Sequence, residues 1–101
     1  MSAPHLETER TPYRHVVRDQ GVRAGLAVVE GTRIGVHDIV GLLQNGETVD
    51  SLLLNCFPDL TRSQVDSCLA YHEDHRGAVD LLIARQMSAE MAAVQPQRGV
   101  I

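Results

Sequence analysis

The chain has 101 residues and a formal net charge of −4, and its composition is 44% hydrophobic and 22% charged. This length allows one small domain with a modest core, and the composition excludes a chain that is disordered throughout. A net acidic chain cannot bind nucleic acid through bulk charge, so any contact with DNA must come from a local basic patch.

The N-terminal third predicts a tail followed by a small β arm. Residues 1–11 are polar and lack periodicity, which predicts a mobile tail. Residues 13–18 and 26–30 have the composition of short strands, and the glycine-containing stretch 19–25 would join them as a loop. The resulting hairpin, within an arm spanning residues 12–35, needs a helix or a second chain to cover it.

From Val36 onward the apolar residues recur with the period of helices. A first helix is predicted to begin at Val36 and to end at the Asn45-Gly46 pair, where Gly46 favours a left-handed C-cap. Thr48 is predicted to cap a second helix, and Pro58 disfavours its continuation.

Thr61 and Gln64 form the capping-box pattern of a third helix. A fourth and longer helix is predicted from about residue 75 to residue 93. The predicted fold class is mostly α, a homeodomain-like or helix-turn-helix core of three helices with the small N-terminal β arm and the longer C-terminal helix. We expect a single domain over residues 12–94 and a tail at 95–101.

The residue types that catalysis and metal binding require are poorly placed in this sequence. The stretch HEDH at residues 72–75 is typical of a solvated helix end more than of a metal site. Cys56 and Cys68 lie in apolar patterns, which predicts buried free thiols. We therefore expect no catalytic residues, no metal and no cofactor. Since no run of 18 apolar residues and no leader pattern occurs, we also expect no membrane span and a cytoplasmic location.

Two groups of residues are candidates for DNA contact. Arg62, Ser63 and Ser67 lie on the outward face of the third predicted helix, where an arginine can take a guanine edge or a phosphate. Arg14 and Arg18 alternate along the first predicted strand, as in two-stranded readers of the major groove. A solvated helix face and the ordinary outer face of a hairpin explain the same residues, and both interpretations stay open.

The last predicted helix has apolar residues on more than one face. One face suffices for packing in a small core, so the excess indicates a surface for a partner, to which methionines bring adaptable contacts. The candidate partner-binding residues are Leu81, Arg85, Met87, Met91 and Val94. A helix packed across the bundle is the alternative.

Residues 28–71 carry two specific motifs, VVEGTRIGV at residues 28–36 and FPDLT at residues 57–61. With the helices between and after them, they resemble the bacterial family catalogued as domain of unknown function 433. Two departures stand out. Many members have Cys-Gly-Gly-Lys-Pro where this chain has RAGLA at residues 23–27, and many have proline in place of Gly35.

The resemblance implies a homeodomain-like fold whose β arm helps to form a homodimer. It also implies the antitoxin of a type II toxin–antitoxin pair, similar to VapB-like antitoxins, beside a PIN-like ribonuclease toxin. We interpret the protein as one that neutralises a toxin encoded by the adjacent gene and represses its own promoter by binding operator DNA. Two alternatives remain, a stand-alone helix-turn-helix transcriptional regulator and a dimeric adaptor that does not bind DNA.

Several motif residues are predicted to serve folding. They are Gly31, Thr32, Arg33, Gly46, Pro58 and Thr61. Gly31 allows the turn out of the strand, and Thr32 and Arg33 can bond exposed backbone where strand gives way to helix. For Arg33, direct contact with DNA or toxin is the other interpretation.

Overall fold

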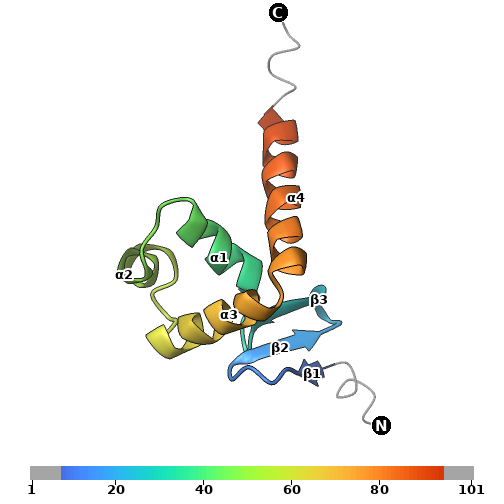
Figure 1. The fold of residues 1–101 in the computed structure, drawn as a ribbon, viewed down its shortest axis with the longest axis vertical. Coiled ribbons are helices and arrows are strands. Elements are labelled where there is room, and N and C mark those ends of the chain that lie inside the picture. The colour runs from blue at the N-terminus through green and yellow to red at the C-terminus, as the bar shows by residue number, and fades with distance from the viewer. Residues whose placement is uncertain (1–7, 95–101) are drawn as a thin grey trace, which may run out of the picture.

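The computed structural model describes residues 8–94, and it describes side chains for residues 8–89. The described chain folds into helices packed on one small antiparallel sheet (Figure 1). In chain order the elements are β1 (Thr8–Arg10), β2 (Val16–Asp19), β3 (Val22–Val29), α1 (Val36–Gln44), α2 (Val49–Ser51), the π-helix η2 (Leu52–Cys56), α3 (Arg62–Asp74) and α4 (Arg76–Val94).

The sheet has the strand order β1-β2-β3 and therefore extends further toward the N-terminus than predicted. Residues 8–10, which we assigned to a mobile tail, pair with β2 in the register Thr8↔Asp19. The Thr8 hydroxyl donates to the Asp19 carboxylate at 2.8 Å, and Arg10 forms an ion pair with Glu30. This edge strand has no apolar side chain, so apolar patterning could not reveal it.

The two predicted strands are also shifted. The first begins only at Val16, because the chain before it turns through His15, which has a positive φ of 71°. The second begins at Val22 and pairs with Asp19, so most of the predicted 19–25 loop belongs to a strand with a bulge. The bulge holds three consecutive left-handed residues, Arg23, Ala24 and Gly25, with φ of 51°, 56° and 86°.

The sheet is buried on both faces near its centre. Val16 and Val29 pair in the register and belong to the core that the helices share, whereas the next pair, Val17 and Val28, points to the opposite face and is also buried. Both faces of the sheet therefore contribute buried side chains at this point.

The predicted helix ends are confirmed for α1 and α3. Gly46 follows the α1 C-cap with a φ of 110°. At the start of α3, the Thr61 hydroxyl accepts from the Gln64 amide at 3.2 Å and the Gln64 side chain accepts from the Thr61 amide at 2.8 Å. These two bonds are the predicted capping box.

The second predicted helix differs from a regular α-helix. Thr48 caps it as expected, with its hydroxyl accepting from the Ser51 amide at 3.0 Å. After one turn the chain widens into the π-helix, closed by the Phe57 amide donating to the Leu52 carbonyl at 2.8 Å. The widening coincides with full burial of Leu52, while Leu54 is 75% exposed.

The core lies between the sheet, α1, α3 and the first two turns of α4. Its fully buried side chains include Ile39, Val65 and Cys68. Burial raises the pKa of the Cys68 thiol to about 12, whereas Cys56 is only half-buried. Both are free thiols, and burial is as predicted for Cys68 alone.

Aromatic contacts fasten the N-terminal segment to α3. Tyr13 meets Tyr71 edge to face at 5.3 Å, Tyr71 stacks on His75 at 4.1 Å, and the Tyr13 hydroxyl donates to Asp74. The hydrogen bond to Asp74 raises the pKa of Tyr13. The segment before β2 is therefore part of the folded body.

The last helix projects from this body, away from the sheet (Figure 1). Val79 and Ile83 are its buried residues, and every side chain from Ala84 to Ala89 is exposed. No helix among residues 8–94 is long and apolar enough to cross a membrane.

Candidate functional site

A groove of about 690 Å³ opens between α1 and the projecting helix α4. Its lining combines apolar side chains with polar groups at the two ends of α1. The lining residues are Arg33, Ile34, His37, Asp38, Gly41, Leu42, Gln44, Asn45, Phe57, Ile83, Gln86 and Met87. We call this feature the α1–α4 groove.

The two helices approach each other at the base of the groove, where Gly41 of α1 lies next to Ile83 of α4. A Cβ atom on Gly41 would stand 3.7 Å from the Ile83 side chain, which is ordinary contact, and a larger side chain would push α4 away. Further along α4 the helices diverge and Met87 remains 55% exposed. The groove is therefore closed at Ile83 and open at Met87.

Three charged or titratable residues form a cluster at the N-terminal end of α1, which we call the Arg23 cluster. The Arg23 guanidinium donates to the Asp38 carboxylate at 2.5 Å and lies 3.4 Å from Nε2 of His37. Asp38 also accepts from the Gly35 amide at 2.8 Å and so caps α1. The cluster ties the bulge of β3 to the first turn of the helix.

His37 is the most deeply buried member of the cluster, with an exposed fraction of 5%. Burial lowers the pKa of His37, against a smaller opposing effect of Asp38. Its Nδ1 atom is buried and makes no hydrogen bond among the described residues. A Cβ atom on Gly35 would stand 2.6 Å from the imidazole, so glycine at position 35 leaves the room that this ring occupies.

The predicted clamp role of Arg33 belongs instead to Arg23. The Arg33 side chain is exposed and makes no hydrogen bond or ion pair with any described residue; only its carbonyl takes part, accepting from Arg23 at 2.9 Å. Arg33 is also one of the residues that line the α1–α4 groove.

The other motif residues act where the chain changes direction. Gly31 has a φ of 83°, and the Thr32 hydroxyl donates to the Val29 carbonyl at 2.8 Å and accepts from the Ile34 amide at 2.9 Å. Pro58 follows the π-helix in an exposed turn. These contacts agree with the roles that the motifs predicted.

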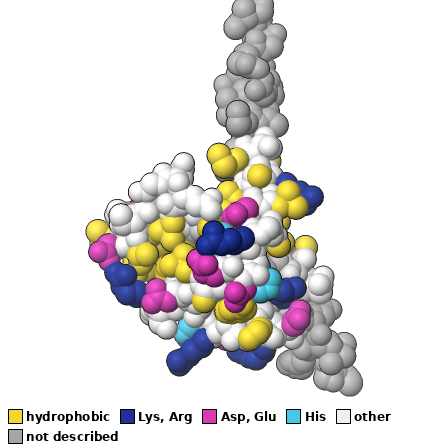
Figure 2. Space-filling view, viewed as in Figure 1, with side chains coloured by type: hydrophobic (Ala, Val, Ile, Leu, Met, Phe, Trp, Pro, Cys, Tyr) yellow, Lys and Arg dark blue, Asp and Glu magenta, His cyan; other side chains and the backbone are white. Residues whose placement is uncertain are grey.

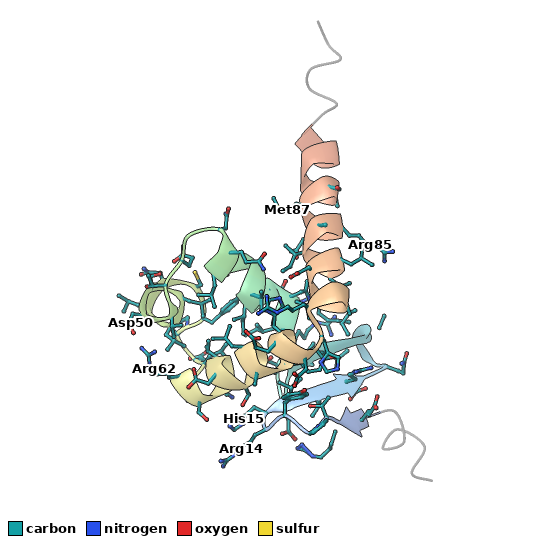
Figure 3. All side chains as sticks on the ribbon, viewed as in Figure 1. Arg14, His15, Asp50, Arg62, Arg85 and Met87 are labelled. Atoms are coloured by element: carbon teal, nitrogen blue, oxygen red, sulfur yellow. The ribbon has the colours of Figure 1, made fainter. Side chains whose placement is uncertain are left out.

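The predicted partner-binding residues of α4 fall on two faces. Figure 3 shows Met87 on the side of α4 toward α1 and Arg85 on the opposite side. Leu81 precedes Arg85 by one helical turn and is 50% exposed. Met91 and Val94 follow Met87 at helical spacing, but their side chains lie outside the described part of the chain.

The predicted DNA-contact residues gather only in part. Arg62 and Ser63 begin α3, and the Ser63 hydroxyl lies 3.4 Å from Nε2 of His15, next to the exposed Arg14 (Figure 3). Arg62 forms an ion pair with Asp50. Ser67, one turn further along α3, is half-buried.

Arg18 departs from its predicted place on an outer face. It is half-buried, its guanidinium donates to the Tyr71 hydroxyl at 3.1 Å, and its Nε is buried without a partner among the described residues. Arg14 lies in the turn before β2, so the two arginines do not share a strand face. The predicted two-stranded reader formed by these arginines is absent.

Residues of the HEDH stretch serve packing between helices. His72 lies 2.9 Å from the Asp80 carboxylate, and this hydrogen bond lowers the pKa of Asp80. Within residues 8–94, no group of three or more His, Cys, Asp or Glu is placed to hold a metal ion.

Arg23, His37 and Phe57 contribute to the groove or its cluster and were not predicted from sequence. His37 directly follows the motif GTRIGV, and its side chain is buried. Arg23 contacts it from a bulge that no sequence pattern predicted. A polar residue at an apolar-spaced helix position was the available signal for His37.

The comparisons with known proteins agree with the resemblance. A family model described as "Protein of unknown function (DUF433)" matches residues 16–72. Among solved structures, the chain is similar to the crystal structure of a DUF433 member protein from Anabaena variabilis ATCC 29413, with 31% identity and a TM-score of 0.66. That match covers 69% of this chain and 68% of the other chain. The comparison with curated proteins finds no match.

Proposed function

The chain belongs to the DUF433 family, and from the surfaces of its fold we propose that it acts by binding another protein through α4, as the antitoxin of a type II toxin–antitoxin pair. The partner is a PIN-like ribonuclease toxin encoded by an adjacent gene. In this proposal the protein is not an enzyme, and it neutralises the toxin by occupying it in a stoichiometric complex.

The observation that carries this proposal is the unpacked second half of α4. From Ala84 to Ala89 every side chain is exposed, Met87 among them. Figure 2 shows hydrophobic side chains on the surface of this projecting helix. Exposed apolar surface on a projecting helix is a common way of presenting a binding face to a groove in a partner. The face that carries Leu81 and Arg85 points away from α1 and is accessible to such a partner.

A second candidate function, repression of its own promoter, is favoured by the cluster at the start of α3. Figure 3 shows Arg14 and Arg62 on the part of the body that lies away from the tip of α4, with Arg14 beside His15 and Arg62 beside Asp50. The Ser63 hydroxyl lies 3.4 Å from Nε2 of His15. The order α1, α2 with η2, then α3 supports a helix-turn-helix interpretation in which α3 enters the major groove. A protein with this layout could bind DNA and a toxin at the same time. A regulator without a toxin, or an adaptor without DNA, would use one of these surfaces alone.

Co-expression with the product of the adjacent gene tests the antitoxin role. We expect that product to arrest growth alone, and we expect growth rescue and co-purification when this chain is present. Leu81→Asp should weaken the complex by about 30-fold or more if Leu81 is a central contact. Leu54→Asp is the matched control, because Leu54 is an exposed leucine on η2, away from α4. A non-toxic neighbour and no complex would refute the proposal.

A further inference from the structure

The α1–α4 groove has an open side, and the helix that forms one of its walls has an uncovered half. We propose that both are covered by a second copy of this chain, whose α4 lies antiparallel to the first α4 and fills the groove. By symmetry the first α4 fills the groove of the second copy. This inference concerns the Met87 side of α4 and does not depend on the toxin, which we assign to the Leu81–Arg85 face.

The exposed side chains of α4 favour a covering partner. The helix runs for 19 residues from Arg76 to Val94, and Val79 and Ile83 anchor its first two turns in the core. Helices in proteins gain most of their stability from packing. The side chains from Ala84 to Ala89 have no such packing within the described chain. A neighbouring helix would supply it.

The groove has the form that a helix requires. Its lining includes the apolar side chains of Ile34, Leu42, Phe57 and Ile83, and Met87 at its open side is 55% exposed. Each copy carries both the groove and the projecting helix. A two-fold axis near Met87 therefore places each α4 in the groove of the other copy and leaves neither surface uncovered. The resulting contact places α1 and α4 of both copies in one four-helix arrangement, for which antiparallel packing is usual.

Charge complementarity supports the second copy over an unrelated apolar peptide. Arg33 lines the groove and makes no side-chain bond with any described residue. In the antiparallel arrangement the C-terminal half of the second α4 runs toward the base of the groove. That half carries Glu90 in its sequence and the negative end of the helix dipole. The carboxylate and the negative end of the dipole would each be stabilised by an arginine nearby.

Sedimentation equilibrium on the full-length chain tests this inference. We expect a dimer that Met87→Asp weakens by about 100-fold, because the substitution places a carboxylate at the centre of an apolar contact. The helical circular dichroism signal and the melting curve of the body show whether the variant is folded. Leu81→Asp is the matched control, since Leu81 is 50% exposed on the other face of the same helix and should leave the dimer intact.

A charge exchange tests the direction of the helices. Arg33→Glu should weaken the dimer, and adding Glu90→Arg to the same chain should restore it. A monomeric wild-type chain would overturn the proposal. So would a dimer that survives Met87→Asp, a dimer equally sensitive to Leu81→Asp, or an exchange that fails to restore association, because each places the contact elsewhere, for example at the β1 edge.

Discussion

Arg23 and Arg33 lie ten residues apart in the chain and differ completely in what their side chains do. Arg23 is held between the Asp38 carboxylate, the Arg33 carbonyl and the His37 ring, and its side chain is 27% exposed. The Arg33 side chain is exposed, and the residue belongs to the lining of the open groove. The family-like motif drew attention to Arg33, but the stabilising contacts belong to Arg23.

Substitution of the two arginines should separate these roles. We expect Arg23→Ala to lower the free energy of unfolding by about 2 kcal/mol, because Asp38 and His37 lose a charged partner in a half-buried setting. Arg33→Ala should change it by less than about 0.5 kcal/mol, as is usual for exposed residues without contacts. Urea denaturation measures both. An Arg33→Ala variant as unstable as Arg23→Ala would contradict this assignment.

His37 should make stability depend on pH. Burial lowers its pKa, so the unfolded chain takes up this proton at a higher pH than the folded chain does. The stabilisation is therefore present above the ordinary histidine value of about 6.5, and it is lost as the pH falls from there through the lowered folded value.

Melting temperatures measured from pH 8 to pH 5 in the wild type and in His37→Gln test the prediction. The variant differs from the wild type only at position 37, so the difference between the two curves isolates His37. The wild type should lose more stability than the variant over this range. Parallel curves would show that His37 is not the group responsible.

At the scale of elements, α4 divides into a packed half and a projecting half. Val79 and Ile83 anchor the first half in the core, where Gly41 of α1 lies next to Ile83. The second half contributes a binding surface and little to the fold of the monomer.

Truncation of α4 should show this division. Removal of residues 88–101 in a Met87→Asp background, where association no longer contributes, should lower the free energy of unfolding of the body by less than about 0.5 kcal/mol. The truncated chain keeps Leu81 and Arg85, so it should retain toxin binding if the proposed antitoxin role is right. Thermal melting at two protein concentrations provides the measurement. A loss of several kcal/mol would mean that the projecting half packs on its own body.

At the scale of the whole molecule, the two candidate surfaces lie at opposite ends (Figure 3). The chain is net acidic, so the cluster around Arg14 and the start of α3 would have to act through a few phosphate or base contacts. Basic and acidic side chains are interspersed on the face that Figure 2 shows. We therefore expect DNA binding of modest affinity that depends on these few residues.

Gel-shift titration with the chain's own promoter DNA tests that layout. Arg14→Ala should weaken binding by about threefold to tenfold, whereas Arg85→Ala, an exposed arginine at the other end, should leave it unchanged. The same two variants should show the opposite pattern in toxin binding. Equal effects of both variants on DNA would indicate non-specific attraction and would remove the case for an operator surface.

Local features of the chain were determined by the sequence alone. The capping box of Thr61 and Gln64, the left-handed Gly46 and the helical spacing after Val36 each involve residues within a few positions of one another. The family could also be identified from its two motifs, since these are contiguous in sequence. For this reason the helices appear close to where they were predicted.

Only the tertiary structure decided the sheet and the site. β1 and the bulge of β3 form through pairing with β2. The sequence did not predict β1 because its residues are polar, and it did not predict the bulge because three consecutive residues there are left-handed. The Arg23 cluster joins residues 14 and 15 positions apart across that bulge, and the groove exists because α4 diverges from α1 after Ile83. Contacts of this kind depend on how elements pack in space, and the spacing of residues along one element does not predict them.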